Sequence, residues 1–273
     1  MAKRSGTFPN LFFWAFLLHL PAFIGTTAYA QPKTSLEPKT LKAYEKFVLE
    51  FEKGIRAMTS GSKPFLWIES QASDKQDSVR RGEILIFKGH KNVDIPKGMI
   101  HVWGVSFFVP GATAEDATKL LLDYNRHKDV YPSVIDSKLL GKEGDTVRGS
   151  LKFKHKKVLT VVLNTEHQAE LTRLDKGRYF IRVHSTRIAE VADSGHPEEH
   201  ELPVGKDSGF MWRLRTYWFL EPQPGGVSIE CQSLTLTRSI PTGLGWLIKP
   251  FVESIPRDSL MELAEGTQKA LRK

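Results

Sequence analysis

The sequence predicts an α+β fold in which an antiparallel sheet is closed by a long C-terminal helix. Three patterns lead to this prediction. Between residues 133 and 239, six strand-like runs follow one another, separated by turn signals such as Asp175-Lys176-Gly177. In the run 210–220, large apolar residues alternate with Arg213, Arg215 and Tyr217, which is typical of a sheet with one covered and one solvated face. Apolar residues then recur at helical spacing through residues 256–273.

The elements before these strands can be read in order. Residues 41–58 carry apolar side chains at steps of three and four, which predicts an amphipathic helix. Short strands are expected at Phe65–Glu69 and Glu83–Lys88, and a stronger one at Met99–Val109. Thr113 and Asp116 then form a capping box that starts a helix running to about Pro132.

The later elements need two further assumptions. Val227 and Cys231 differ in parity from Leu234, so a β-bulge near Gln232 is expected in the last strand. Ser254 and Pro256 are suited to the cap and first turn of the final helix, and the polar loop 193–208 is expected to be mobile. The six runs are Ser133–Gly141, Thr146–Lys154, Lys157–Glu166, Arg178–Val191, Phe210–Glu221 and Val227–Ser239.

Residues 1–30 are typical of a cleavable secretory signal peptide. Lys3 and Arg4 precede the apolar run Leu11–Leu20, and Ala28-Tyr29-Ala30 supplies small residues for cleavage before Gln31. The alternative is a retained anchor, but this run is about half the ~20 residues that span a bilayer. We therefore expect an exported protein, periplasmic or secreted, with an N-terminal extension at 31–94 and the main domain at 95–273.

Composition narrows the function classes. The chain carries a formal net charge of +8, and removal of Lys3 and Arg4 with the signal peptide leaves +6. In an exported protein this mild excess suggests transient contact with anionic lipid head groups at a membrane surface, or with acidic polymers, rather than binding of nucleic acid. The alternative is an ordinary solvated surface. Cys231 is the only cysteine, so no disulfide can form within the chain, and its strand-like surroundings indicate a small buried residue. No dinucleotide fingerprint, P-loop or nucleophile elbow occurs, so no cofactor and no catalytic residue are predicted.

Two long phrases resemble a known family. The stretch WGVSFFVPGATAEDATKLLLDYNRHKDVYPSVIDSKLL, residues 103–140, is similar to the opening of START-like domains of the polyketide cyclase and lipid-transport superfamily (SRPBCC). Residues 209–260 resemble START-like proteins of bacteria that are mostly uncharacterised. The resemblance implies a helix-grip fold, in which a curved sheet wraps around the C-terminal helix and leaves a cavity for a lipid, sterol, polyketide or other apolar ligand.

Alternation along the strands and the helical stripe select the residues expected to face inward, towards either a dry core or a cavity. Sequence pattern does not separate these two alternatives. The candidate lining residues are Trp103, Val105, Phe107, Tyr179, Ile181, Val183, Arg187, Trp212, Leu214, Trp218, Trp246, Leu260, Leu263, Ala264 and Thr267.

Arg187 is the polar member of this set. It shares parity with Tyr179 and Ile181, so it is expected to point inward, whereas Glu190 is expected on the wet face. A buried guanidinium must be paired, and its partner is either a protein carboxylate such as Glu166 or the head group of a bound acid.

Two other segments have competing interpretations. The apolar segment Gly243–Val252 either packs on the sheet or forms an exposed lip that touches a membrane. His196 to His200 match the string HxxEH, but Pro197 lies inside it, so a loop is expected and no metal site is predicted.

The leading hypothesis is an exported, non-enzymatic protein that holds a hydrophobic small molecule or lipid between sheet and helix. One alternative is an enzyme of the cyclase or aromatase kind, which would bring Arg187, Tyr179 and a His or Glu together in the cavity. The other is an interaction protein with a filled core. Ligand identity and oligomeric state stay open.

Overall fold

The computed structural model describes residues 34–156, 160–240 and 245–272. Residues 32–273 form one compact unit. In the described part, nine strands form an antiparallel sheet in the order β1-β2-β9-β8-β6-β5-β4-β3, and β7 pairs with β6 beside this path. The strands are β1 (Leu85–Ile95), β2 (Gly98–Pro110), β3 (Val134–Glu143), β4 (Thr146–Lys156), β5 (Thr160–Arg173), β6 (Tyr179–Ala192), β7 (His200–Glu201), β8 (Arg213–Gln223) and β9 (Gly226–Arg238).

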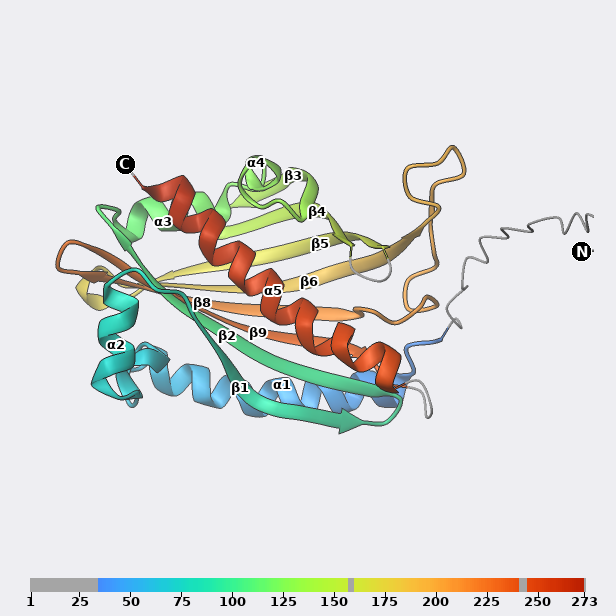
Figure 1. Cartoon of the computed structure of the whole chain (residues 1–273), viewed down its shortest axis with the longest axis horizontal. Helices are drawn as coiled ribbons and strands as arrows, with labels where there is room; N and C mark the ends of the chain where they lie inside the picture. Colours follow the sequence, from blue (N-terminus) through green and yellow to red (C-terminus); the bar gives the residue numbers. More distant parts are fainter. Residues whose placement is uncertain (1–33, 157–159, 241–244, 273) are drawn as a thin grey trace, which may run out of the picture. The chain divides into compact units, whose positions relative to one another are not determined.

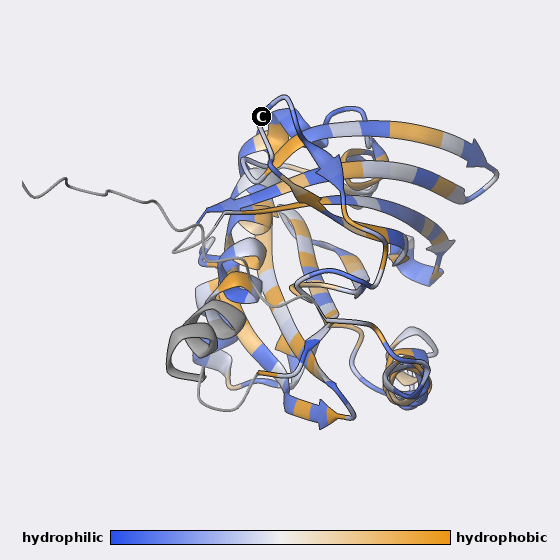
Figure 2. Ribbon diagram, turned by 90° about the vertical axis from the view of Figure 1, so that its right-hand side faces the viewer, coloured by the Kyte–Doolittle hydropathy of each residue, from blue (hydrophilic) through white to orange (hydrophobic). Residues whose placement is uncertain are grey.

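Helices cover both faces of this sheet. Helix α5 (Gly245–Leu271) crosses one face, which we call the inner face (Figure 1). Helix α1 (Pro38–Thr59) lies on the opposite, outer face, and Figure 2 shows it end-on across the strands from α5. The remaining helices are η1 (Trp67–Ser70), α2 (Ser73–Arg80), α3 (Ala114–Leu122), α4 (His127–Val130) and η2 (Asp175–Gly177).

The sequence did not predict that helix α1 covers the outer face of the sheet. Tyr217, Phe219, Leu234 and Leu236 on this face are buried in one cluster with Tyr44 and other residues of α1. The prediction of one wet face is therefore wrong for these strands, although the alternation itself is present. The prediction of a bulge near Gln232 is also wrong, because β9 pairs in unbroken register with both β2 and β8. Leu234 and Leu236 face α1, so apolar residues of both parities are buried without any shift.

The N-terminal segment is attached through aromatic packing. Trp67 of η1 stacks on Phe87 of β1, with ring centroids 3.7 Å apart. The Phe87 ring lies over Gly104 so closely that a Cβ atom there would come within 2.2 Å of it. The segment Phe65–Glu69, expected as a strand, includes the start of this 3₁₀ turn, in which the Glu69 carboxylate accepts from the Leu66 N–H at 3.0 Å.

Helix boundaries follow the capping signals only in part. The Thr113–Asp116 capping box is present, with the Asp116 N–H donating to Thr113 Oγ1 at 3.0 Å, and it starts α3. That helix ends at Leu122, and α4 follows separately. Helix α5 begins at Gly245, well before the expected start at Pro256, so both Pro250 and Pro256 lie inside it. A proline removes one backbone donor, which bends a helix without always ending it.

Candidate functional site

Strand register arranges the inner face in rows that run across the sheet. One row joins Val105, Cys231, Trp218 and Ile181 on β2, β9, β8 and β6, and all four are buried. They form one core cluster with residues of α3 and with Leu260, Ala264 and Leu271 of α5. The C-terminal half of α5 therefore packs directly on the sheet, and the expectation of a helix held away from it is wrong at this end.

The residues in the next two rows are more exposed and more polar than those in the first row. Trp103, Ser233, Thr216 and Val183 face one another across the same four strands, and each is only half-buried. Thr235 and Leu214 follow in the next row, also half-buried. We call these six residues the inner patch. It combines three apolar side chains with three hydroxyls and lies beside the tightly packed end of the face.

Two buried polar atoms lie at the β2 side of the inner patch without a hydrogen-bond partner among the described residues. They are Nε1 of Trp103 and Nδ1 of His101. The other ring nitrogen of His101, Nε2, lies 3.1 Å from Thr237 Oγ1, and burial lowers the pKa of His101 to about 4. At the rim, the Lys88 ammonium lies 5.4 Å from the Trp103 ring centroid. A buried polar atom without a partner costs free energy, so these two call for an explanation.

Another polar group lies on the inner face near α4. His167 Nε2 is 2.7 Å from Thr165 Oγ1, and the ring of His127 packs against Tyr124 with centroids 4.8 Å apart. Burial lowers the pKa of His127 to about 4 and that of His167 to about 3. Both imidazoles are therefore neutral near pH 7. Tyr124 packs so closely on Gly149 that a Cβ there would lie 2.1 Å from its ring, so any larger residue at this position would displace the tyrosine.

Arg187 does not point inward as predicted. The pairing of β5 with β6 shifts register between Glu166 and His167, which leaves Thr186 unpaired and reverses the parity of the residues after it. Arg187 consequently lies on the outer side, where it forms an ion pair with Glu201 of β7. Arg187 is therefore paired with a protein carboxylate, which was one of the two alternatives, but the partner is Glu201 and not Glu166.

The same bulge brings Glu190 to the inner face, opposite to the prediction. Glu190 pairs in register with Leu163, which packs with Ile188 and with Ile255 of α5. Its carboxylate accepts hydrogen bonds from the Ser208 N–H at 3.0 Å and from the Ser208 hydroxyl at 2.8 Å. Burial raises the pKa of this carboxyl. Glu190 thus holds the end of the 193–208 loop, which the sequence suggested to be mobile.

The other predicted lining residues divide between different surroundings. Trp212 is buried in the outer cluster, where its Nε1 donates to Asp207 Oδ1 at 2.9 Å. Thr267 bonds Tyr131 Oη at 3.1 Å and is fully buried. The side chain of Trp246 lies outside the described residues, as do those of the segment 243–252. Those that contribute to the inner-face core are Trp103, Val105, Phe107, Tyr179, Ile181, Val183, Trp218, Leu260, Leu263 and Ala264.

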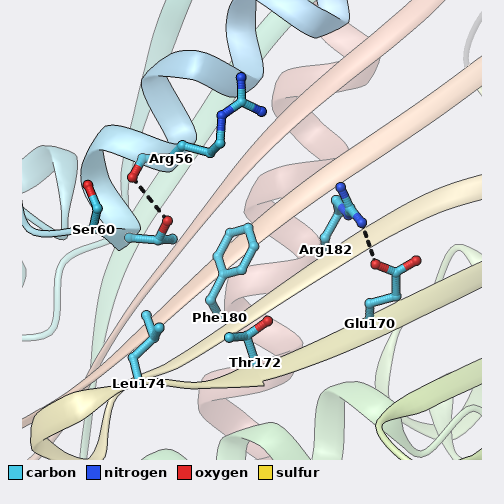
Figure 3. Close-up of a pocket in the computed structure, with 8 residues that line it drawn as sticks. Arg56, Ser60, Glu170, Thr172, Leu174, Phe180 and Arg182 are labelled. Carbon is cyan, nitrogen blue, oxygen red and sulfur yellow. Dashed lines mark hydrogen bonds and ion pairs between the residues drawn. The ribbon is translucent and has the colours of Figure 1, made fainter.

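A separate pocket opens on the outer face beside the C-terminal end of α1. It has a volume of about 500 Å³ and is lined by residues of α1, β5 and β6, among them Arg56, Ser60, Phe180 and Arg182 (Figure 3). Arg182 forms an ion pair with Glu170 inside it. No feature of the sequence indicated this pocket, because the predicted sheet left its outer face open to solvent.

The HxxEH string lies on the surface of the molecule. Its exposed residues run from a turn at His196 into β7 at His200, and no cluster suited to a metal ion occurs among the described residues. Within the same part of the chain, no helix is long and apolar enough to cross a membrane.

The strand order, the antiparallel pairing and the position of α5 make this a START-like helix-grip fold, as the sequence predicted. No family model matches the chain, and no curated protein does.

Solved structures with a similar fold were found at low identity. A STAR-related lipid transfer protein fragment from Xanthomonas axonopodis is 20% identical, with 65% of this chain and 98% of that chain covered and a TM-score of 0.45. The Zhui aromatase/cyclase from Streptomyces sp. R1128 is 10% identical, covering 63% and 94%, with a TM-score of 0.43. Human STARD10 is 12% identical, covering 73% and 80%, with a TM-score of 0.40. These likenesses concern the fold alone.

Proposed function

We propose that this chain is an exported, non-enzymatic binding protein that holds a hydrophobic small molecule or a lipid against the inner face of its sheet. One observation carries the proposal. The apolar side chains of Trp103, Val183 and Leu214 remain half-buried in the middle of the inner face, whereas their neighbours in the next row are fully buried. Covering such side chains with an apolar molecule gains about 25 cal/mol for each Å² removed from water.

The hydroxyls of the inner patch suit a ligand with limited polarity. Small-molecule sites are mostly apolar and carry a few placed polar groups that fix orientation. Thr216 accepts a hydrogen bond from Trp218 Nε1 at 3.2 Å, while Ser233 and Thr235 lie beside it on β9. The fold supports the same kind of ligand, because the solved structures of similar fold include a lipid transfer protein and an aromatase/cyclase.

The cyclase alternative gains no support from the site. It required Arg187 and Tyr179 to converge, and they lie on opposite faces of β6 on either side of the Thr186 bulge. The neutral imidazoles His127 and His167 lie near α4, outside the inner patch. We therefore assign no catalytic role to any residue.

The test is ligand identification followed by a blocking variant. Protein purified without detergent is extracted with organic solvent, and the extract is analysed by mass spectrometry; an apolar compound in stoichiometric amount is expected. Leu214→Lys places a charge in the inner patch and should abolish co-purification. Leu49→Lys is the matched control, because Leu49 is 63% exposed on α1 and should leave binding unchanged. Protein that is repeatedly empty, or equal loading of both variants, would contradict the proposal.

Export is tested separately. Cleavage after Ala30 should give a mature chain that begins at Gln31, and intact-mass measurement of protein from the extracytoplasmic fraction will show it. Full-length chain retained in the cytoplasm would contradict export while leaving the binding proposal untouched.

A further inference from the structure

The pocket on the outer face, which we call the outer pocket, lies between the C-terminal end of α1 and the strands β5 and β6 (Figure 3). Its volume of about 500 Å³ is in the range of small-molecule sites, which is roughly 300–1,000 Å³. On the strand side, Phe180 pairs in register with Thr172, and Arg182 pairs with Glu170, so all four side chains project from the outer face. The last turn of α1 supplies the opposite wall. The N-terminal segment therefore builds a cavity on a face that carries no part of the inner patch.

Phe180 gives the outer pocket an aromatic floor. Its ring centroid lies 5.2 Å from that of Phe219, which is fully buried, so the outer cluster supports the ring from one side. Phe180 itself is only half-buried, and Figure 3 shows its ring pointing from β6 towards the end of α1. Leu174 also lines the pocket. Because a second aromatic ring gains free energy on such a floor beyond that of area burial alone, the floor suits a flat apolar group.

The charged residues that line the outer pocket leave one cation unmatched. Arg182 forms an ion pair with Glu170, and these two charges cancel. Arg56 forms no ion pair with a carboxylate in the part of the chain that the structure describes. Glu52, one turn before Arg56, is turned towards the sheet, where it accepts a hydrogen bond from Tyr217 Oη at 3.0 Å. Two arginines against one glutamate give the pocket wall a net charge of +1.

The hydroxyls at the end of α1 do not add donors for an anion. Thr59 Oγ1 donates to the Ile55 carbonyl oxygen at 3.2 Å, and Ser60 Oγ donates to that of Ala57 at 3.4 Å. Their hydrogens are therefore engaged within the helix, and an anion in the pocket depends on Arg56. A guanidinium binds a carboxylate through two parallel N–H···O bonds, so the wall matches a single carboxylate better than a doubly charged phosphate.

We propose that the outer pocket is a second binding site, which takes a small aromatic carboxylic acid. The ring of the acid packs on Phe180, and its carboxylate pairs with Arg56. This site goes beyond the proposed function, because it lies on the opposite face of the sheet and takes a water-soluble anion in place of an apolar molecule. A ligand held in this way contacts α1 and β6 at once, so its binding also holds α1 on the sheet.

The experiment follows two probes on native protein by ¹⁹F NMR of the ligand. The first probe is 4-fluorophenylacetate, and the second is 4-fluorophenylacetamide, which keeps the ring but carries no charge. Native protein should bind the acid about tenfold more tightly than the amide, the effect of one hydrogen bond to a charged group. Acetate at the same concentration should not displace the acid, because acetate has no ring to pack on Phe180.

Substitutions separate the contact with the carboxylate from the contact with the ring. Arg56→Gln should weaken binding of the acid about tenfold and leave the amide unchanged, whereas Phe180→Leu should weaken both probes by roughly threefold to tenfold. Arg56→Lys keeps the positive charge but loses the paired N–H groups, so it should restore only part of the affinity. Lys53→Gln is the matched control: Lys53 is an exposed cation one turn before Arg56 and does not line the pocket, so its loss should change binding less than about twofold.

The outcomes distinguish this inference from the proposed function. If native protein does not bind 4-fluorophenylacetate, or binds acid and amide equally, the outer site is refuted and the inner patch is unaffected. Equal weakening by Arg56→Gln and Lys53→Gln also refutes it, because the acid would then be attracted by surface charge in general. Binding that is lost in Leu214→Lys but kept in Arg56→Gln would place the acid on the inner face. Empty organic extracts together with a tenfold effect of Arg56→Gln would refute the proposed function and support the outer site.

Discussion

At the scale of single residues, buried polar groups on the outer face connect two elements. On the outer face, Tyr217 Oη donates to Glu52 Oε1 at 3.0 Å, and Arg215 lies 3.3 Å from Glu45 Oε2. These bonds tie β8 to α1. On the inner face, His101 Nδ1 and Trp103 Nε1 have no hydrogen-bond partner among the described residues. Tyr44 Oη of the outer cluster also lacks a partner among the described residues, so such atoms occur on both faces.

Glu230 is a buried carboxyl whose ionisation should lower stability. It lies fully buried on β9, accepts from the Ile68 N–H at 3.4 Å and from Gln232 Nε2 at 2.9 Å, and burial raises its pKa to about 7. The folded state therefore binds this proton more tightly than the unfolded state does. The contribution of Glu230 to stability is complete below about pH 4.5 and is lost as pH rises through about 7.

Glu230→Gln should remove this pH dependence. Its stability should match that of native protein near pH 4.5 and exceed it at pH 8 by an amount on the order of 3 kcal/mol. Urea unfolding followed by circular dichroism at several pH values measures the difference. Glu50→Gln, an exposed carboxylate paired with Lys53, is the control and should change little. A Glu230→Gln variant less stable than native at pH 8 would show that the charged form is the stabilising one.

The scale of elements shows what α1 contributes. Its apolar stripe was evident from the sequence, and the helix was predicted at 41–58 and found at Pro38–Thr59. Its docking site was not predicted, because the alternation on β8 was interpreted as one wet face. Tyr217 and Phe219 are large and apolar enough to have indicated a second covered face, but Arg213 and Arg215, which precede them on the same face of the strand, suggested solvent.

Substitutions on the two sides of α1 test its docking. Val48 is 2% exposed in the outer cluster, whereas the neighbouring Leu49 is 63% exposed. Val48→Asp buries a charge without a partner and should lower the free energy of unfolding by roughly 3 kcal/mol or more. Leu49→Asp should stay within about 0.5 kcal/mol of native. Chemical denaturation compares them, and equal stability of the two variants would mean that α1 contributes nothing to the folded state.

Bulges explain why some side chains face the opposite side of the sheet from the one predicted. The succession of strands along the chain could be predicted, because turn residues separate the strands from Val134 to Arg238. The Thr186 bulge left no signal, since Thr is an ordinary strand residue, and one unpaired position was enough to reverse Arg187 and Glu190. The expected bulge at Gln232 was unnecessary because both faces of β9 are covered.

At the scale of the whole molecule, the inner face divides into a packed end and a half-open middle. Residues such as Val105 and Trp218 were selected correctly as inward-facing, but the pattern did not tell core from ligand surface. That distinction depends on where α5 contacts the sheet, which is a tertiary property. Helix α5 begins at Gly245, earlier than the prolines suggested, so its path over the sheet also could not be predicted.

This division predicts how bound ligand affects stability. A ligand that binds only the folded state stabilises it by about 2.7 kcal/mol when its free concentration is a hundred times Kd. For a domain of this size that should raise Tm by on the order of 5–10 °C. We expect delipidated protein to melt lower than protein with ligand restored, and Leu214→Lys to show no such difference because its inner patch is blocked. Calorimetric scans of both proteins, with and without the extracted ligand, measure this. An equal rise in Tm for Leu214→Lys would place the ligand elsewhere, with the outer pocket beside Arg56 and Arg182 the first alternative to test.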